Sequence, residues 1–83
     1  MSDSDKDLSL AMRIKVARTI RNLRQGDVAY LAYEKLRAMG PGWATFRVHS
    51  GDVSALETGG KTSQIKTRAI LEVLGIAMEA TNA

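Results

Sequence analysis

The stretch of residues 48–59 predicts a short helix with one apolar and one polar face. Val53 and Leu56 are spaced to share one side of a helix, and Gly59 follows where many helices end in a left-handed turn. The polar residues of the stretch fall on the opposite side: His49, Ser50, Ser54 and Thr58. Such a helix has one face to bury and one face to present, so a small helical domain is expected around it.

Apolar residues at helical spacing also predict a first helix over residues 8–23. Ser4 or Asp5 is expected to cap it. One stripe comprises Leu8, Met12, Val16, Ile20 and Leu23, and a narrower one comprises Leu10, Ile14 and Ala17. Only one stripe can face a shared core, so the other needs a separate cover.

Two further helices follow from the same reasoning. One starts at Asp27 and ends at Gly40-Pro41-Gly42, and one of its faces carries Val28, Leu31, Ala32, Lys35, Leu36 and Met39. The last helix starts after a Thr62 or Ser63 cap and stops at Gly75. Its buried side is expected to be Ile65, Ala69, Ile70, Val73 and Leu74.

The 83 residues allow one small domain, which would bury only about 60% of its unfolded surface. We expect a disordered tail at residues 1–7, the domain at 8–76 and a C-terminal tail at 77–83. The chain has no cysteine, which excludes disulfides and thiolate metal sites. No apolar run approaches the roughly 20 residues of a membrane span, and the acidic N-terminus is unlike a signal peptide, so a cytoplasmic location is expected.

Positive charge is concentrated near the N-terminus. The net charge is +3, yet every charged residue in 8–26 is basic: Arg13, Lys15, Arg18, Arg21 and Arg24. This pattern suits an anionic partner such as DNA phosphate, and a solvated basic helix face is the alternative.

Three residues stand at positions typical of one DNA-binding family. Arg18 lies seven residues before Gln25, which opens the second helix region, and Glu57 ends the helix of residues 48–59. With Leu74-Gly75-Ile76, these residues resemble the Cro/repressor or xenobiotic-response-element (XRE) helix-turn-helix family over roughly residues 10–76. The resemblance implies an all-α, lambda-repressor-like domain of four to five helices. It also implies an ion pair between Arg18 and Glu57, for which two surface charges are the alternative.

An insertion of residues 33–47 separates the two halves of the expected helix-turn-helix. It contains the only tryptophan, Trp43, and the only phenylalanine, Phe46. Both rings are expected to cover the surplus stripe of Met12, Val16 and Ile20 within one chain. Alternatively, these five residues form a surface for a partner protein.

The resemblance also assigns DNA contacts. Phosphate contacts would come from Arg24, Gln25, Lys61, Thr62 and Lys66, with Arg47 as an arm-like basic group. Base contacts would come from His49, Ser50, Ser54 and Thr58. The helix carries no Arg, Asn or Gln, the residues that make the strongest base contacts. Specificity would then rest on DNA shape, or the helix no longer reads DNA.

The sequence offers no enzyme, metal or cofactor site. His49 is the lone histidine, and the glycines between Thr58 and Thr62 lack the spacing of a phosphate-binding loop. We therefore expect a repressor-like, sequence-specific transcriptional regulator that binds double-stranded DNA as a homodimer on a two-fold operator. The alternative is a helix-turn-helix fold that binds another regulatory protein, as an antiactivator or antitoxin does.

Overall fold

Ser9 sets the start of the first helix in the computed structural model, which describes residues 9–76. Its Oγ accepts a hydrogen bond from the Met12 N–H at 3.1 Å, and α2 runs over Leu10–Ile20. The helix is shorter than the expected 8–23 because Asn22 adopts a left-handed conformation (φ 57°). The proposed caps Ser4 and Asp5, Leu8 and the tails at 1–7 and 77–83 lie outside the described residues.

Helices α2, α4 (Ser50–Glu57) and α5 (Gln64–Leu74) end in the same way. Asn22, Gly59 and Gly75 take positive φ angles of 57°, 87° and 71°. The residue after each one bonds back to the last helical turn: Leu23 N to Arg18 O at 3.0 Å, Gly60 N to Ala55 O at 2.7 Å and Ile76 N to Leu71 O at 2.9 Å. This left-handed C-terminal motif satisfies carbonyls that a helix end would leave unbonded.

The expected insertion is absorbed by a longer helix and a short turn. Helix α3 spans Gln25–Met39, starting two residues before the expected Asp27 and continuing through the first part of the insertion. The 3-10 helix η1 follows at Pro41–Thr45, after Gly40 turns the chain with a φ of 140°. The Tyr33 hydroxyl donates to the Ala44 carbonyl at 3.1 Å, which ties η1 to α3.

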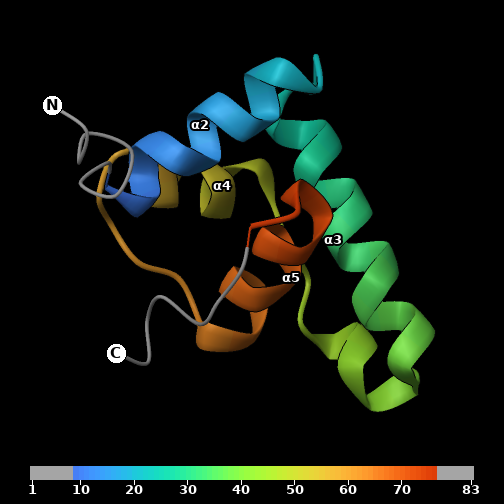
Figure 1. Cartoon of the computed structure of the whole chain (residues 1–83). Helices are drawn as coiled ribbons and strands as arrows, with labels where there is room; N and C mark the ends of the chain where they lie inside the picture. Colours follow the sequence, from blue (N-terminus) through green and yellow to red (C-terminus); the bar gives the residue numbers. More distant parts are fainter. Residues whose placement is uncertain (1–8, 77–83) are drawn as a thin grey trace, which may run out of the picture.

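Figure 1 shows α2 crossing the top of the molecule and α3 descending along one side, with η1 at its lower end. Helices α4 and α5 fill the angle between them, and each contacts both α2 and α3. Ser63 caps α5 as expected, because its Oγ accepts the Lys66 N–H at 3.2 Å. The described part of the chain is all-helical, as the sequence predicted.

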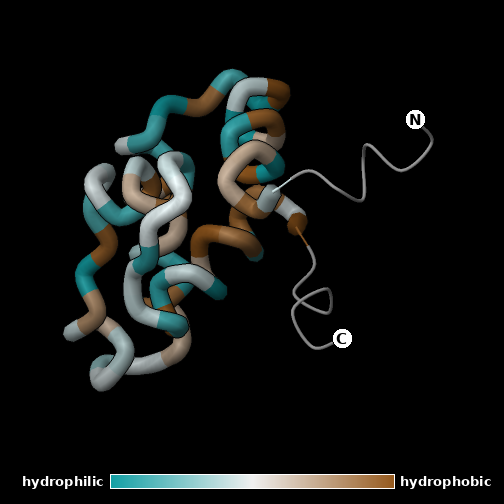
Figure 2. Tube along the Cα trace, turned by 90° about the vertical axis from the view of Figure 1, so that its left-hand side faces the viewer, coloured by the Kyte–Doolittle hydropathy of each residue, from teal (hydrophilic) through white to brown (hydrophobic). Residues whose placement is uncertain are grey.

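The core lies where these helices meet. Each of α2, α3, α4 and α5 contributes to it, and the side chains with 0% exposure are Ile14, Val28, Ala32, Val53, Ile70 and Leu71. The narrower α2 stripe faces this core, because Leu10 and Ala17 also pack against it. Figure 2 shows hydrophobic residues distributed in short stretches among hydrophilic ones rather than in one block. Among residues 9–76, no helix is both long and apolar enough to cross a membrane.

The expected cover of the outer α2 stripe is wrong. Trp43 and Phe46 lie 6.1 Å apart between ring centroids and pack at the edge of the core beside α3, not over α2. The tie between Tyr33 and Ala44 holds η1 against the far half of α3, so its rings cannot reach the stripe. Met12, Val16 and Ile20 are therefore uncovered, with 46%, 42% and 75% of their surface exposed.

Two isoleucines of α2 test this division of its faces. Ile14 is fully buried, so Ile14→Ala should lower the free energy of unfolding by about 2 to 5 kcal/mol. Ile20→Ala makes the same truncation on the same helix at a 75% exposed site, and should change it by no more than about 0.5 kcal/mol. Urea unfolding followed by circular dichroism measures both. Equal losses would contradict the assignment of the two faces.

Candidate functional site

Arg18 on α2 and Glu57 at the end of α4 form a two-pronged ion pair. Arg18 Nε lies 2.6 Å from Glu57 Oε2, and Arg18 Nη2 lies 3.0 Å from Glu57 Oε1. The side chains are only 17% and 5% exposed. This bidentate geometry is the strong form of a charge-assisted hydrogen bond. The ion pair predicted from the sequence is confirmed.

The pair is extended into a junction of three helices. Arg18 Nη1 donates to the Leu23 carbonyl at 3.0 Å, in the turn between α2 and α3. Gln25, the first residue of α3, donates from Nε2 to Glu57 Oε1 at 3.1 Å. One carboxylate thus fixes the start of α3 against the end of α4. We call Arg18, Gln25 and Glu57 the junction.

The charges in the junction are mutually stabilised. Burial alone would raise the pKa of Glu57, but hydrogen bonds from Arg18 and Gln25 and the charges of Arg18 and Lys15 outweigh it and lower that pKa. The hydrogen bond to Glu57 in turn raises the pKa of Arg18 despite the opposing effect of burial. Glu57 therefore stays ionised, and its negative charge is neutralised inside the protein.

Asp52, the other acid of α4, is also held by its neighbours. Its Oδ2 accepts the His49 N–H at 2.8 Å, and its Oδ1 accepts the Thr62 hydroxyl at 2.7 Å. Lys66 Nζ lies 3.8 Å from Oδ2. Burial alone would raise the pKa of Asp52, but these bonds and the charges of Lys66 and His49 lower it. The carboxylate caps α4 and links it to α5.

The outward face of α4 is consequently built from small or neutral groups. His49 precedes the helix as its N-cap residue, and Ser50 opens the helix; both are exposed. Ser54 is half-buried in the middle. The Thr58 hydroxyl donates to the carbonyls of Ser54 and Ala55 at 3.0 and 3.1 Å, so it closes the helix end. Gly51 has open space around its Cα, which leaves the first turn of α4 accessible.

Three basic residues adjoin the junction or follow the turn at the end of α4. Arg24 precedes Gln25 of the junction, Lys15 acts electrostatically on Glu57, and Lys61 follows the turn in which Gly60 bonds to Ala55. All three are exposed, and none is in an ion pair within residues 9–76. We call Lys15, Arg24 and Lys61 the basic rim. Gly26, two residues after Arg24 in the first turn of α3, also has open space where a Cβ would stand.

Of the other residues assigned to phosphate contacts, three contact the acids of α4 and one does not. Gln25, Thr62 and Lys66 contact the acids of α4, as described above. Arg47 lies away from the rim, with its guanidinium carbon 5.7 Å from the centroid of the Tyr33 ring. The structure thus brings Arg24, Gln25, Lys61, Thr62 and Lys66 to the ends of α4 and leaves Arg47 beside α3.

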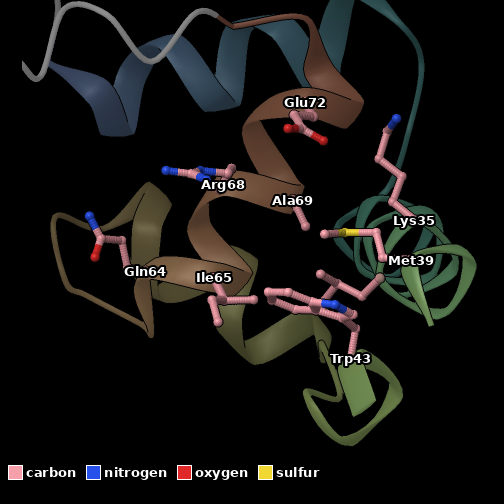
Figure 3. A pocket seen from close by; sticks show the side chains of 9 residues that line it. Lys35, Met39, Trp43, Gln64, Ile65, Arg68, Ala69 and Glu72 are labelled. Carbon is pink, nitrogen blue, oxygen red and sulfur yellow. The ribbon is translucent and has the colours of Figure 1, made fainter. Parts of the chain in front are cut away.

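A groove between α3 and α5 was not foreseen from the sequence. Its cavity is about 330 Å³, and Trp43 of η1 lies at one end (Figure 3). Met39, Ile65 and Ala69 turn toward the same space. Met39 was expected to share a helix face with Val28 and Leu36, which are buried, yet it is 58% exposed. Met39 is the last residue of α3, directly before Gly40, and a side chain at a helix end has fewer neighbours to bury it. This position is the signal in the sequence that could have predicted its exposure.

No family model, curated protein or solved structure matches this chain. Among residues 9–76, no three His, Asp or Glu side chains gather where they could hold a metal ion. The case for function therefore depends on the junction, the basic rim and the face of α4.

Removing the Glu57 carboxylate should destabilise the domain strongly. Glu57→Ala leaves the Arg18 guanidinium largely buried without its partner, which costs about 3 to 5 kcal/mol. Glu34→Ala is the matched control, because the Glu34–Arg37 pair is well exposed and should contribute at most about 1 kcal/mol. Urea unfolding of both variants measures the difference. Similar small losses would show that the junction does not hold the helices together.

The lowered pKa values of Asp52 and Glu57 predict a loss of stability in acid. As the pH falls through the ordinary values of 3.8 and 4.5, the unfolded chain takes up protons before the folded one, which favours unfolding. The free energy of unfolding should be level above about pH 6 and decline below about pH 5. Asp52→Asn should be less stable at pH 7 and show a shallower decline. Urea midpoints from pH 7 to 3 test this, and parallel profiles would contradict it.

Proposed function

We propose that this chain is a small transcriptional regulator of the Cro/repressor helix-turn-helix type that binds double-stranded DNA as a homodimer. The proposed contact surface is the outward face of α4 together with the basic rim. The rim and the backbone N–H groups at the start of α3 would hold phosphates, and His49, Ser50 and Ser54 would approach the bases.

The observation that carries the proposal is the inward placement of both α4 acids. Asp52 and Glu57 are each neutralised by bonds to neighbouring helices or loops. The surface that remains combines small polar groups with the exposed cations of the rim. A polyanion can approach such a surface closely, because no exposed carboxylate of α4 repels it.

The composition of the α4 face supports affinity more than sequence discrimination. Bidentate base contacts from Arg, Asn or Gln are worth about 1 to 3 kcal/mol each, and this face offers only hydroxyls and one imidazole. Binding should therefore depend mainly on phosphate contacts and on the shape of the DNA.

Two variants within the proposed surface and one control variant outside it test the DNA-binding proposal. Arg24→Ala and Lys61→Ala should each weaken binding to all duplexes about equally and reduce the salt slope of log K by about one unit. Arg37→Ala removes an exposed arginine at the far end of α3 and should leave the affinity and slope unchanged. Fluorescence anisotropy with labelled duplex at several salt concentrations measures these values. Equal effects of Arg24→Ala and Arg37→Ala would contradict a localised surface.

The second candidate function is binding of another regulatory protein. The exposed stripe of Met12, Val16 and Ile20 favours it, because three large apolar side chains in line are unusual on the surface of a small monomer. The same stripe could instead join two copies of this chain on DNA. A folded chain that binds no duplex even at low salt would favour the partner-binding function over the DNA-binding one.

A further inference from the structure

We infer that the groove between α3 and α5 is a binding site for a small aromatic carboxylate. This site lies outside the proposed DNA surface and does not depend on it. One side of it is formed by residues that the resemblance to the helix-turn-helix family leaves unexplained, in the second half of α3 and in η1, and the other side is formed by α5.

The size and lining of the groove suit a small molecule. Its volume of about 330 Å³ falls within the range of small-molecule pockets. In Figure 3 the Trp43 ring forms one wall, and Met39, Ile65 and Ala69 point into the same space. Leu36 completes the apolar lining. A flat ring can stack against an indole and contact aliphatic side chains and a thioether sulfur around it.

The backbone that carries the Trp43 ring is held in position by the fold. The Trp43 backbone N–H donates to the Gly40 carbonyl at 3.1 Å, and the Trp43 carbonyl accepts the Phe46 backbone N–H at 3.1 Å. The bond from Tyr33 to Ala44 ties the whole 3-10 turn to α3. A pocket whose wall is already in place requires little ordering when a ligand binds.

The polar groups at the edge of the groove determine which ligand charge fits. Lys35 stands on α3, and Glu72 and Arg68 stand four residues apart on α5. None of the three is in an ion pair within the described part of the chain. Two cations and one carboxylate give the edge of the groove a net charge of +1, and Lys35 is the cation on the α3 side. A carboxylate attached to the bound ring can pair with Lys35.

Three phenyl compounds whose terminal groups are negative, neutral and positive test the inference: 3-phenylpropionate, 3-phenylpropionamide and 3-phenylpropylamine. The chain has one tryptophan, so a ¹⁵N-labelled sample gives a single indole N–H signal in the NMR spectrum, from Trp43. The carboxylate should shift this signal and bind about threefold to fivefold more tightly than the amide, as one exposed charge pair allows.

Charge-neutral variants assign the effect to the groove. Lys35→Gln should abolish the preference for the carboxylate over the amide, whereas Lys61→Gln, at an exposed lysine outside the groove, should retain it. Tightest binding of the amine would place the ligand charge on Glu72 and overturn the inference. No shift of the Trp43 signal at millimolar ligand would also overturn it.

A peptide probe separates a small ligand from a protein partner. Acetyl-Glu-Phe-Glu-amide presents the same phenyl and carboxylate groups on a polypeptide. If it shifts the Trp43 signal at tenfold lower concentration than 3-phenylpropionate, the groove takes a protein segment and the small-molecule assignment is wrong. Weaker binding of the peptide supports the assignment. Since the readout is Trp43 and not DNA, failure here leaves the proposed DNA binding standing.

Discussion

The bidentate bond between Arg18 and Glu57 is the constraint on which the rest of the structure depends. It joins the last turn of α2 to the end of α4 across 39 positions of sequence, and Gln25 adds the start of α3 to the same carboxylate. A guanidinium and a carboxylate this far from water are stable only as partners. The placement of α4 against α2 and α3 is therefore fixed by charge as well as by the apolar contacts of Val53 and Leu56.

Both acids of α4 form bonds that stabilise the fold. A helix of eight residues has little room for both a buried side and a binding side, and two of its residues are acidic. Asp52 caps the helix start, where the positive end of the helix favours a carboxylate, and Glu57 turns toward α2. Each acid thereby strengthens the fold, and its negative charge is removed from the outward face. The bonds that hold α4 in place thus also keep negative charge away from the surface proposed for DNA.

The sequence predicted the parts of this fold that depend on local patterns and on one charge pair. Helical periodicity located the four α-helices of residues 9–76 and both apolar stripes of α2, and Ser63 and Gly75 marked the ends of α5. It could not predict where Trp43 and Phe46 pack, because that depends on the hydrogen bond from Tyr33 to Ala44, which no local pattern shows. Nor did any spacing connect Thr62 or Lys66 to Asp52, since those contacts need the completed arrangement of α4 against α5.

The length of α3 separates two regions of the molecule. Its first half carries Gln25 and packs against α4, whereas its second half carries Lys35 and Met39 and meets α5 and Trp43 across the groove. A helix extended by two turns moves the inserted aromatic residues away from the junction without disturbing it, because each turn advances about 5.4 Å along the axis. The surface proposed for DNA and the groove proposed for a ligand can therefore vary independently. What connects them is α5, which holds Lys66 near Asp52 at its first turn and lines the groove with Ile65 and Ala69.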